Sequence, residues 1–254
     1  MASVLRHAKG YITASLVAEC LKVSPKKAQS FLASWAKRGW LSRIRKGIYL
    51  ALDISAESSD EVLVDPWKIA AELFEPCYIS GWSAAQYWDL TEQIFETTII
   101  LTTKQVSKKL YLLGQTRFLL KKISENQMFG TKTVWKDRLK VQVADRHKAI
   151  TDMLDDPSLG GGIITVTDFL QAYLLSSECN PQILLDYAEK MKNRTIFKRL
   201  GFLISLLSPD KKDIIEKCLQ NISKGNSQLD PAIKSSRLIK KWRLWVPQNF
   251  HITK

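Results

Sequence analysis

The sequence lacks the cysteine and histidine patterns that define metal-binding and redox proteins. Its four cysteines lie far apart, with no Cys-x-x-Cys pair, and its three histidines show no metal-ligand spacing. This argues against a zinc knuckle or a redox motif and favours reduced thiols in the core. We therefore expect no metal and no cofactor. The cysteines are Cys20, Cys77, Cys179 and Cys218.

Long hydrophobic runs are also missing. No apolar stretch approaches the roughly 18 residues of a membrane helix, and the first residues lack the apolar core of a signal peptide. We therefore expect a cytoplasmic protein with no membrane partner. With 45% hydrophobic residues in 254, the chain can bury a real core, which excludes a disordered protein. The length suits one large domain or two ordinary ones.

Recognisable catalytic patterns are absent as well. Gly81-Trp82-Ser83 is not followed by the closely spaced carboxylates with which a nucleotidyltransferase holds metal. Residues 160–162, three glycines, lack the lysine and hydroxyl of a phosphate loop and predict a turn between helices. Asp152, Asp155 and Asp156 fall near a predicted helix end, where we expect solvated carboxylates. The sequence therefore predicts that the protein is not an enzyme.

Acidic residues are scarce in the first fifth of the chain. Residues 1–50 hold ten Lys or Arg and a single acid, Glu19, a net charge of +9 within a total of +13. Residues 51–75 hold seven acids and one lysine, a net charge of −6. This reversal predicts a linker at 53–64 between a domain of residues 1–52 and a domain of residues 65–254. The basic excess favours nucleic acid as a partner.

Two helices are predicted in the basic segment. The first covers residues 13–20 and is capped by Thr13. The second covers residues 24–38, where Ser24-Pro25 supplies an N-cap hydroxyl and a proline at the first helical position, and it stops at Gly39. The apolar residues that recur at helical spacing and predict its core-facing side are Ala28, Phe31, Leu32 and Trp35.

The opposite side of the second helix is small, polar and basic, which suits entry into a major groove. Two strand-like runs follow at residues 40–44 and 48–52, around a turn containing Gly47. Together these elements describe a winged helix-turn-helix. A protein-interaction module with a solvated basic face is the alternative, but charge, helix ends and hairpin all agree on DNA. The candidate DNA-binding residues are Lys26, Lys27, Gln29, Ser30, Ser34, Lys37, Arg38, Arg43, Arg45 and Lys46.

The rest of the chain predicts an α+β domain, with a small antiparallel sheet followed by a helical lobe. Asp65-Pro66 opens a helix that runs to Phe74, and Ser80 is expected to cap another. The expected strands cover residues 77–79, 97–102, 116–123 and 139–143. The expected helices of the lobe cover residues 146–154, 166–177, 183–191, 195–207 and 211–222.

Basic residues also gather near the C-terminus, where they are interleaved with Trp242 and Trp245. Such a composition suits nucleic-acid binding by charge and stacking. It suits equally a terminal strand or helix in which Leu238 and the two tryptophans pack while the cations face water. The sequence leaves both interpretations open.

Three segments carry a family resemblance. They are Arg45-Lys46-Gly47-Ile48-Tyr49, residues 78–93 with Gly81-Trp82-Ser83-Ala84-Ala85 and Asp89-Leu90-Thr91, and residues 143–154 followed by Pro157 and Gly161-Gly162. In this order they resemble the AbiEi antitoxin family of bacterial abortive-infection toxin–antitoxin systems. The resemblance covers most of residues 10–180. The chain departs from it at Gly81 and Trp88-Asp89, where a His and a His-Gly are often seen.

The resemblance implies a transcriptional autorepressor whose winged helix binds repeats in its own promoter, as double-stranded DNA. It also implies a C-terminal antitoxin domain that counteracts a nucleotidyltransferase toxin without a stable complex. An ordinary winged-helix regulator, with a ligand-sensing or protein-interaction C-terminal domain, is the alternative. A co-transcribed nucleotidyltransferase gene would distinguish the two. The candidate antitoxin surface consists of Gln86, Asp89, Arg146 and Lys148.

Overall fold

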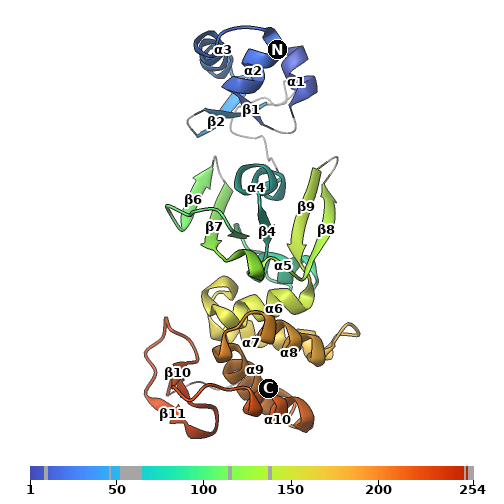
Figure 1. The fold of residues 1–254 in the computed structure, drawn as a ribbon, viewed down its shortest axis with the longest axis vertical. Coiled ribbons are helices and arrows are strands. Elements are labelled where there is room, and N and C mark those ends of the chain that lie inside the picture. Colours follow the sequence, from blue (N-terminus) through green and yellow to red (C-terminus); the bar gives the residue numbers. More distant parts are fainter. Residues whose placement is uncertain are drawn as a thin grey trace.

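The computed structural model describes residues 1–8, 11–45, 47–51, 65–113, 116–136, 139–248 and 250. It is a mixed α and β structure, as the sequence predicts (Figure 1). Its buried apolar side chains form two separate clusters, one within residues 4–49 and the other within residues 69–250. The predicted linker at 53–64 lies outside the described residues, so the division into domains stays a prediction.

The N-terminal module, residues 1–51, combines three helices with a small antiparallel sheet. Both predicted helices are present, and each has its predicted cap: Thr13 Oγ1 accepts from the Leu16 N–H at 3.2 Å, and Ser24 Oγ from the Lys27 N–H at 3.4 Å. The sequence did not predict the helix at Ala2–His7 or the strand at Ile12–Thr13. The elements are α1 (Ala2–His7), β1 (Ile12–Thr13), α2 (Ala14–Leu21), α3 (Pro25–Lys37), β2 (Leu41–Arg45) and β3 (Ile48–Ala51), with strand order β1-β3-β2.

A six-stranded sheet forms the centre of the remaining chain. In spatial order its strands are β6 (Leu110–Leu113), β7 (Thr116–Lys122), β5 (Thr97–Thr102), β4 (Cys77–Ile79), β9 (Leu139–Ala144) and β8 (Thr131–Lys136). The predicted small, mainly antiparallel sheet is confirmed only in part: β4–β5, β6–β7 and β8–β9 pair antiparallel, whereas β4–β9 and β5–β7 pair in parallel. Parallel partners are remote in sequence or joined by a crossover, so local patterns do not reveal them. The buried run Ile99-Ile100-Leu101 is typical of such a central strand.

Helices cover both faces of this sheet. Side chains alternate along β4, so Cys77 points to one face, where its Sγ donates to the Ala70 carbonyl of α4 (Pro66–Phe74). Tyr78 points to the other face, where its hydroxyl donates to Asp152 of α6 (Arg146–Asp155) at 3.1 Å. In the chain, α5 (Gly81–Tyr87) follows β4 directly. The central strands β4 and β5 are buried, and β4 contacts α4 on one face and α6 on the other.

The predicted helical lobe is present and its helix bounds lie close to the expected ones. After α6 come α7 (Ile163–Leu175), α8 (Pro181–Lys190), α9 (Arg194–Leu207) and α10 (Lys212–Gln220). Short 3-10 helices occur at Glu125–Gln127, Pro157–Gly160 and Lys240–Trp242. Of the three glycines predicted to form a turn, Gly160 ends the second 3-10 helix, and Gly161 and Gly162 form the turn into α7 at positive φ. A second three-stranded sheet, β10 (Ser227–Gln228), β12 (Leu244–Val246) and β11 (Arg237–Ile239), completes the lobe. In the described part of the chain, no helix is long and apolar enough to cross a membrane.

Candidate nucleic-acid interface

The inner side of α3 fixes the orientation of the helix in the N-terminal module. Ala28, Leu32 and Trp35 are buried, and Phe31 stacks on Trp35 with ring centroids 5.8 Å apart. Gly39 adopts a φ of +71°, which ends the helix in a left-handed residue, as its sequence predicts. The predicted core-facing stripe is thus confirmed, and it determines which side of α3 meets solvent.

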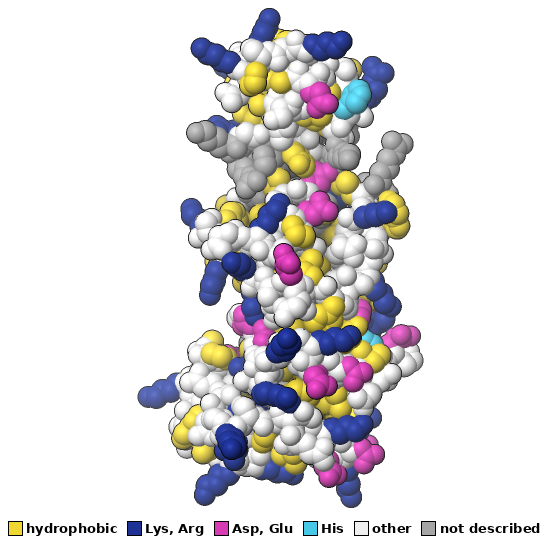
Figure 2. Space-filling model, viewed as in Figure 1, with side chains coloured by type: hydrophobic (Ala, Val, Ile, Leu, Met, Phe, Trp, Pro, Cys, Tyr) yellow, Lys and Arg dark blue, Asp and Glu magenta, His cyan; other side chains and the backbone are white. Residues whose placement is uncertain are grey.

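The outer side of α3 carries the predicted polar and basic residues. Every one of them is exposed: Lys26, Lys27, Gln29, Ser30, Ser34, Lys37 and Arg38. Arg43 of β2 is exposed too, whereas Lys46 and the side chain of Arg45 lie outside the described residues. None of the exposed cations forms an ion pair with a described carboxylate. Dark-blue Lys and Arg side chains accordingly project from this module in the space-filling view (Figure 2).

This arrangement provides two kinds of contact for a polyanion. Short side chains such as Ser30 and Ser34 permit close approach of the helix axis to base edges, and Gln29 beside them can donate and accept hydrogen bonds. The cations at both ends of the helix suit phosphates. The Arg38 guanidinium lies 5.1 Å from the Trp40 ring centroid, a contact that restrains its long side chain.

The predicted antitoxin surface is only partly on the surface. Gln86 lies within α5 and is half-buried, and Asp89, just after α5, is exposed. Arg146 at the start of α6 is half-buried. The Arg146 guanidinium lies 4.9 Å from the Trp88 ring centroid, and Trp88 is itself held by a 2.7 Å hydrogen bond from Nε1 to the Ala144 carbonyl. Asp89 and Arg146 therefore border the same tryptophan.

Sequence reasoning missed the lysines of β8 that lie beside this tryptophan. Lys132 lies 5.5 Å from the Trp88 ring centroid, and Lys136 lies 5.1 Å from that of Trp67. Tyr87 connects the two tryptophans, with centroids 5.1 Å from Trp67 and 4.7 Å from Trp88. The two lysines are four residues apart, and this even spacing predicts that they share one face of the strand. It does not predict their aromatic partners, which come from elsewhere in the chain.

Lys148 was predicted on this surface, and that prediction is wrong. Its side chain is fully buried and its ammonium pairs with Asp152 Oδ1, one helical turn later on α6. The ammonium also donates to the Tyr78 hydroxyl at 2.8 Å. Helical periodicity alone allows Lys148 on either side of α6. It lies on the inner side because a buried charge needs a partner, and the Asp152 carboxylate is buried there.

The expectation that Asp152 is solvated is wrong for the same reason. The carboxylate is 1% exposed and accepts hydrogen bonds from Tyr78 and, at 2.7 Å, from Ser80 Oγ. Ser80 is the N-cap residue of α5, as predicted, but its hydroxyl is bonded to Asp152 and makes no cap hydrogen bond. Burial and the Asp152 charge raise the pKa of Tyr78 well above its usual value. The group of Tyr78, Ser80, Lys148 and Asp152 joins β4 to α6.

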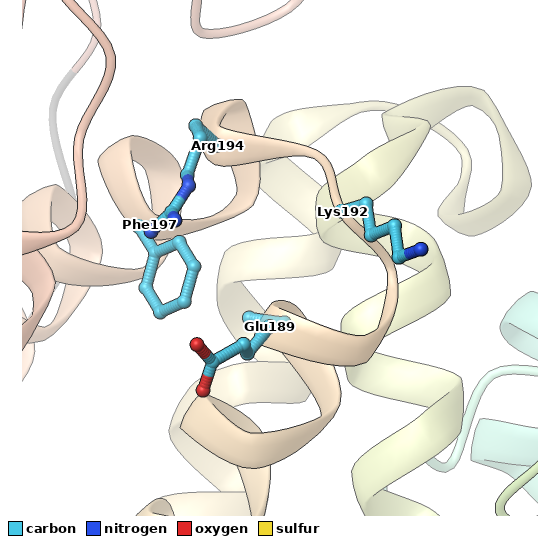
Figure 3. A pocket seen from close by; sticks show the side chains of 5 residues that line it. Glu189, Lys192, Arg194 and Phe197 are labelled. Atoms are coloured by element: carbon cyan, nitrogen blue, oxygen red, sulfur yellow. The ribbon is translucent and has the colours of Figure 1, made fainter.

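A pocket of about 290 Å³ lies between the end of α8 and the start of α9. In Figure 3 the Arg194 and Glu189 side chains face the Phe197 ring, while Lys192 points away. Arg194 is already bound to Asn221 Oδ1 at 2.6 Å. No group of three His, Cys, Asp or Glu side chains in the described part could hold a metal ion. That the protein is not an enzyme stays a prediction.

Together these features define a mixed α and β protein with a small, basic, helical N-terminal module. Residues 1–51 of this chain match the family model described as "Transcriptional regulator, AbiEi antitoxin", so the resemblance seen in the sequence is confirmed for the N-terminal module. A search of curated proteins finds no match.

A solved structure extends the likeness in fold to almost the whole chain. The RV2827C protein from Mycobacterium tuberculosis has a similar fold, with a TM-score of 0.62 over 96% of this chain and 89% of that chain. The two sequences are 12% identical, so the likeness concerns the fold alone.

Proposed function

We propose that the protein is a DNA-binding transcriptional regulator of the antitoxin type, whose N-terminal module works as a winged helix-turn-helix. The observation that carries the proposal is the two-sided α3, with Leu32 and Trp35 buried and a continuous polar and basic face exposed. The family match of residues 1–51 supports it independently. In this proposal α3 enters the major groove of the protein's own promoter, and the β2–β3 hairpin contacts phosphates or the minor groove.

Binding of the full chain to a labelled duplex from its own upstream region tests this proposal. Affinity should fall with salt at a log–log slope of about −0.9 for each phosphate neutralised. Gln29→Ala should reduce the preference for the promoter over a scrambled duplex, whereas Lys26→Ala/Lys37→Ala should weaken both duplexes alike. The charge-matched control is Lys108→Ala/Lys109→Ala, which changes two exposed lysines just before β6 of the six-stranded sheet. Equal effects of all three variants would contradict the assignment to α3.

The antitoxin activity belongs, in this proposal, to residues 65–254, which counteract a nucleotidyltransferase toxin without catalysis and without a stable complex. Its support is the family resemblance of these residues together with the surface around Trp88, where Asp89 and Arg146 present opposite charges. A regulator with a ligand-sensing C-terminal domain is the second candidate.

Growth rescue separates the two candidates. The full chain, expressed from an unrelated promoter, should rescue cells that express a nucleotidyltransferase toxin co-transcribed with its gene. Lys26→Ala/Lys37→Ala should still rescue, because repression is not needed under these conditions, whereas Arg146→Glu should not. Circular dichroism must show that Arg146→Glu is folded. No rescue by the wild-type chain would favour the ligand-sensing regulator.

A further inference from the structure

The small sheet of the C-terminal lobe presents one rigid outer face. Its central strand β12 alternates, so that Leu244 and Val246 are fully buried while Trp245 between them is 36% exposed. The preceding Trp242 is buried against Gly201 of α9, where a Cβ atom would come within 2.2 Å of the indole. Close packing of the inner face therefore holds the outer face in place.

Trp245 lies in the middle of this outer face. The strand register puts Gln228 of β10 and Leu238 of β11 directly beside it, and both therefore share its face. Within the described part of the chain, no other ring and no cation stacks on the Trp245 indole. The exposed Trp135 differs, since the Lys140 ammonium lies 5.2 Å from its ring centroid. Trp245 is thus an exposed indole whose ring face carries no cation.

The chain segment that forms this face is rich in cations and lacks acids. Residues 231–254 contain six Lys or Arg and no Asp or Glu. The nearest preceding acid, Asp230, is 2% exposed and accepts from the Ile163 N–H at 2.8 Å. Figure 1 places β10 and β11 at the lower left, and Figure 2 shows dark-blue side chains and no magenta in that region. The exposed cations, none within 4.0 Å of a described carboxylate, are Lys234, Arg237, Lys240, Lys241 and Arg243.

We propose that this outer face, formed by Gln228, Leu238 and Trp245 within a segment rich in exposed cations, binds single-stranded nucleic acid. An unpaired base stacks on the indole, and the Lys and Arg side chains bind the flanking phosphates. The Gln228 amide lies beside the stacked base and can bond its edge. A duplex keeps its base faces covered by neighbouring pairs, so the unoccupied ring selects single strands. The site is independent of the proposed duplex binding by α3.

Fluorescence anisotropy tests the proposal by measuring how the full chain binds a labelled oligothymidylate. A length of about 12 nucleotides is within the range that one such surface covers. Trp245→Ala should weaken binding roughly 5- to 150-fold, the range expected when one base no longer stacks on an aromatic ring. Trp245→Phe keeps an aromatic face and should retain most of the affinity. The matched control is Trp135→Ala, which removes a more exposed indole and should change nothing. Unchanged affinity in Trp245→Ala would overturn the proposal, as would no binding by the wild-type chain.

Two further measurements separate this site from others. Lys240→Ala/Arg243→Ala should reduce the salt slope by about 0.7 for each phosphate that is no longer neutralised, and Lys108→Ala/Lys109→Ala should not. Lys26→Ala/Lys37→Ala should weaken binding of the promoter duplex and leave binding of oligothymidylate unchanged. Trp245→Ala should weaken binding of oligothymidylate and leave binding of the promoter duplex unchanged. Failure of the α3 variant to bind the oligonucleotide would place single-strand binding on the N-terminal module and overturn the proposal. Binding to vesicles containing phosphatidylglycerol, but not to the oligonucleotide, would show a membrane site instead.

Discussion

Replacing Lys148 by Met should destabilise the protein by about 3–5 kcal/mol. The ammonium and its partner Asp152 are both fully buried, so the variant leaves a carboxylate inside the protein with only the Tyr78 and Ser80 hydroxyls as donors. Methionine fills nearly the same space, so the destabilisation reflects the unpaired charge and not a cavity. At roughly 2–4 °C per kcal/mol for a domain of this size, the melting temperature should fall by about 6–20 °C.

Thermal unfolding followed by circular dichroism measures this destabilisation, and a double-mutant cycle assigns it to the pair. Asp152→Asn should also be costly, and Lys148→Met/Asp152→Asn should cost less than the sum of the two single changes. The control Arg117→Met breaks the exposed pair with Glu96 and should stay within about 1 kcal/mol of the wild type. If Lys148→Met behaves like Arg117→Met, or if the two single changes add, the buried pair does not stabilise the link between β4 and α6.

Three further predictions concern other parts of the fold. Trp35→Ala should cost about 3–5 kcal/mol and lower the calorimetric melting transition of the N-terminal module while leaving a second transition unchanged; a single cooperative transition that shifts as a whole would refute the predicted linker. Asp145→Ala should cost about 0.5–2 kcal/mol at neutral pH, because its carboxylate caps α6 by accepting from the Lys148 N–H. Burial opposes this charge, but the His147 imidazole 3.6 Å away and the hydrogen bonds from the Lys148 N–H and Tyr187 outweigh burial and lower the pKa of Asp145 below 3.8. The stabilisation is therefore complete above pH 3.8 and disappears as the pH falls further, so denaturant titrations should show wild type and Asp145→Ala converging in acid. Gly81→Ala should cost more than about 1–2 kcal/mol in the same titration, because φ is +55° and the new Cβ would lie 2.2 Å from the Leu159 carbonyl oxygen; a neutral change would contradict this backbone geometry.

Local chemistry in the sequence was enough to predict much of the N-terminal module. Thr13 and Ser24 accept hydrogen bonds from N–H groups three residues ahead, and Gly39 ends α3 by its own backbone conformation. The polar face of α3 follows from the apolar spacing of Leu32 and Trp35, because a helix turns by a fixed angle per residue. Each of these signals spans only a few residues.

Tertiary structure alone decided features that depend on remote partners. Lys148 is buried because Tyr78, 70 residues earlier, brings its hydroxyl to the same place. The parallel pairing of β4 with β9 joins Ile79 to Val143, and no local pattern encodes it. The same holds for Trp245, since burial of Trp242 against Gly201 determines which face of β12 is outward. Charge pairing, strand partners and exposure are set by distant side chains, so a single sequence read locally cannot specify them.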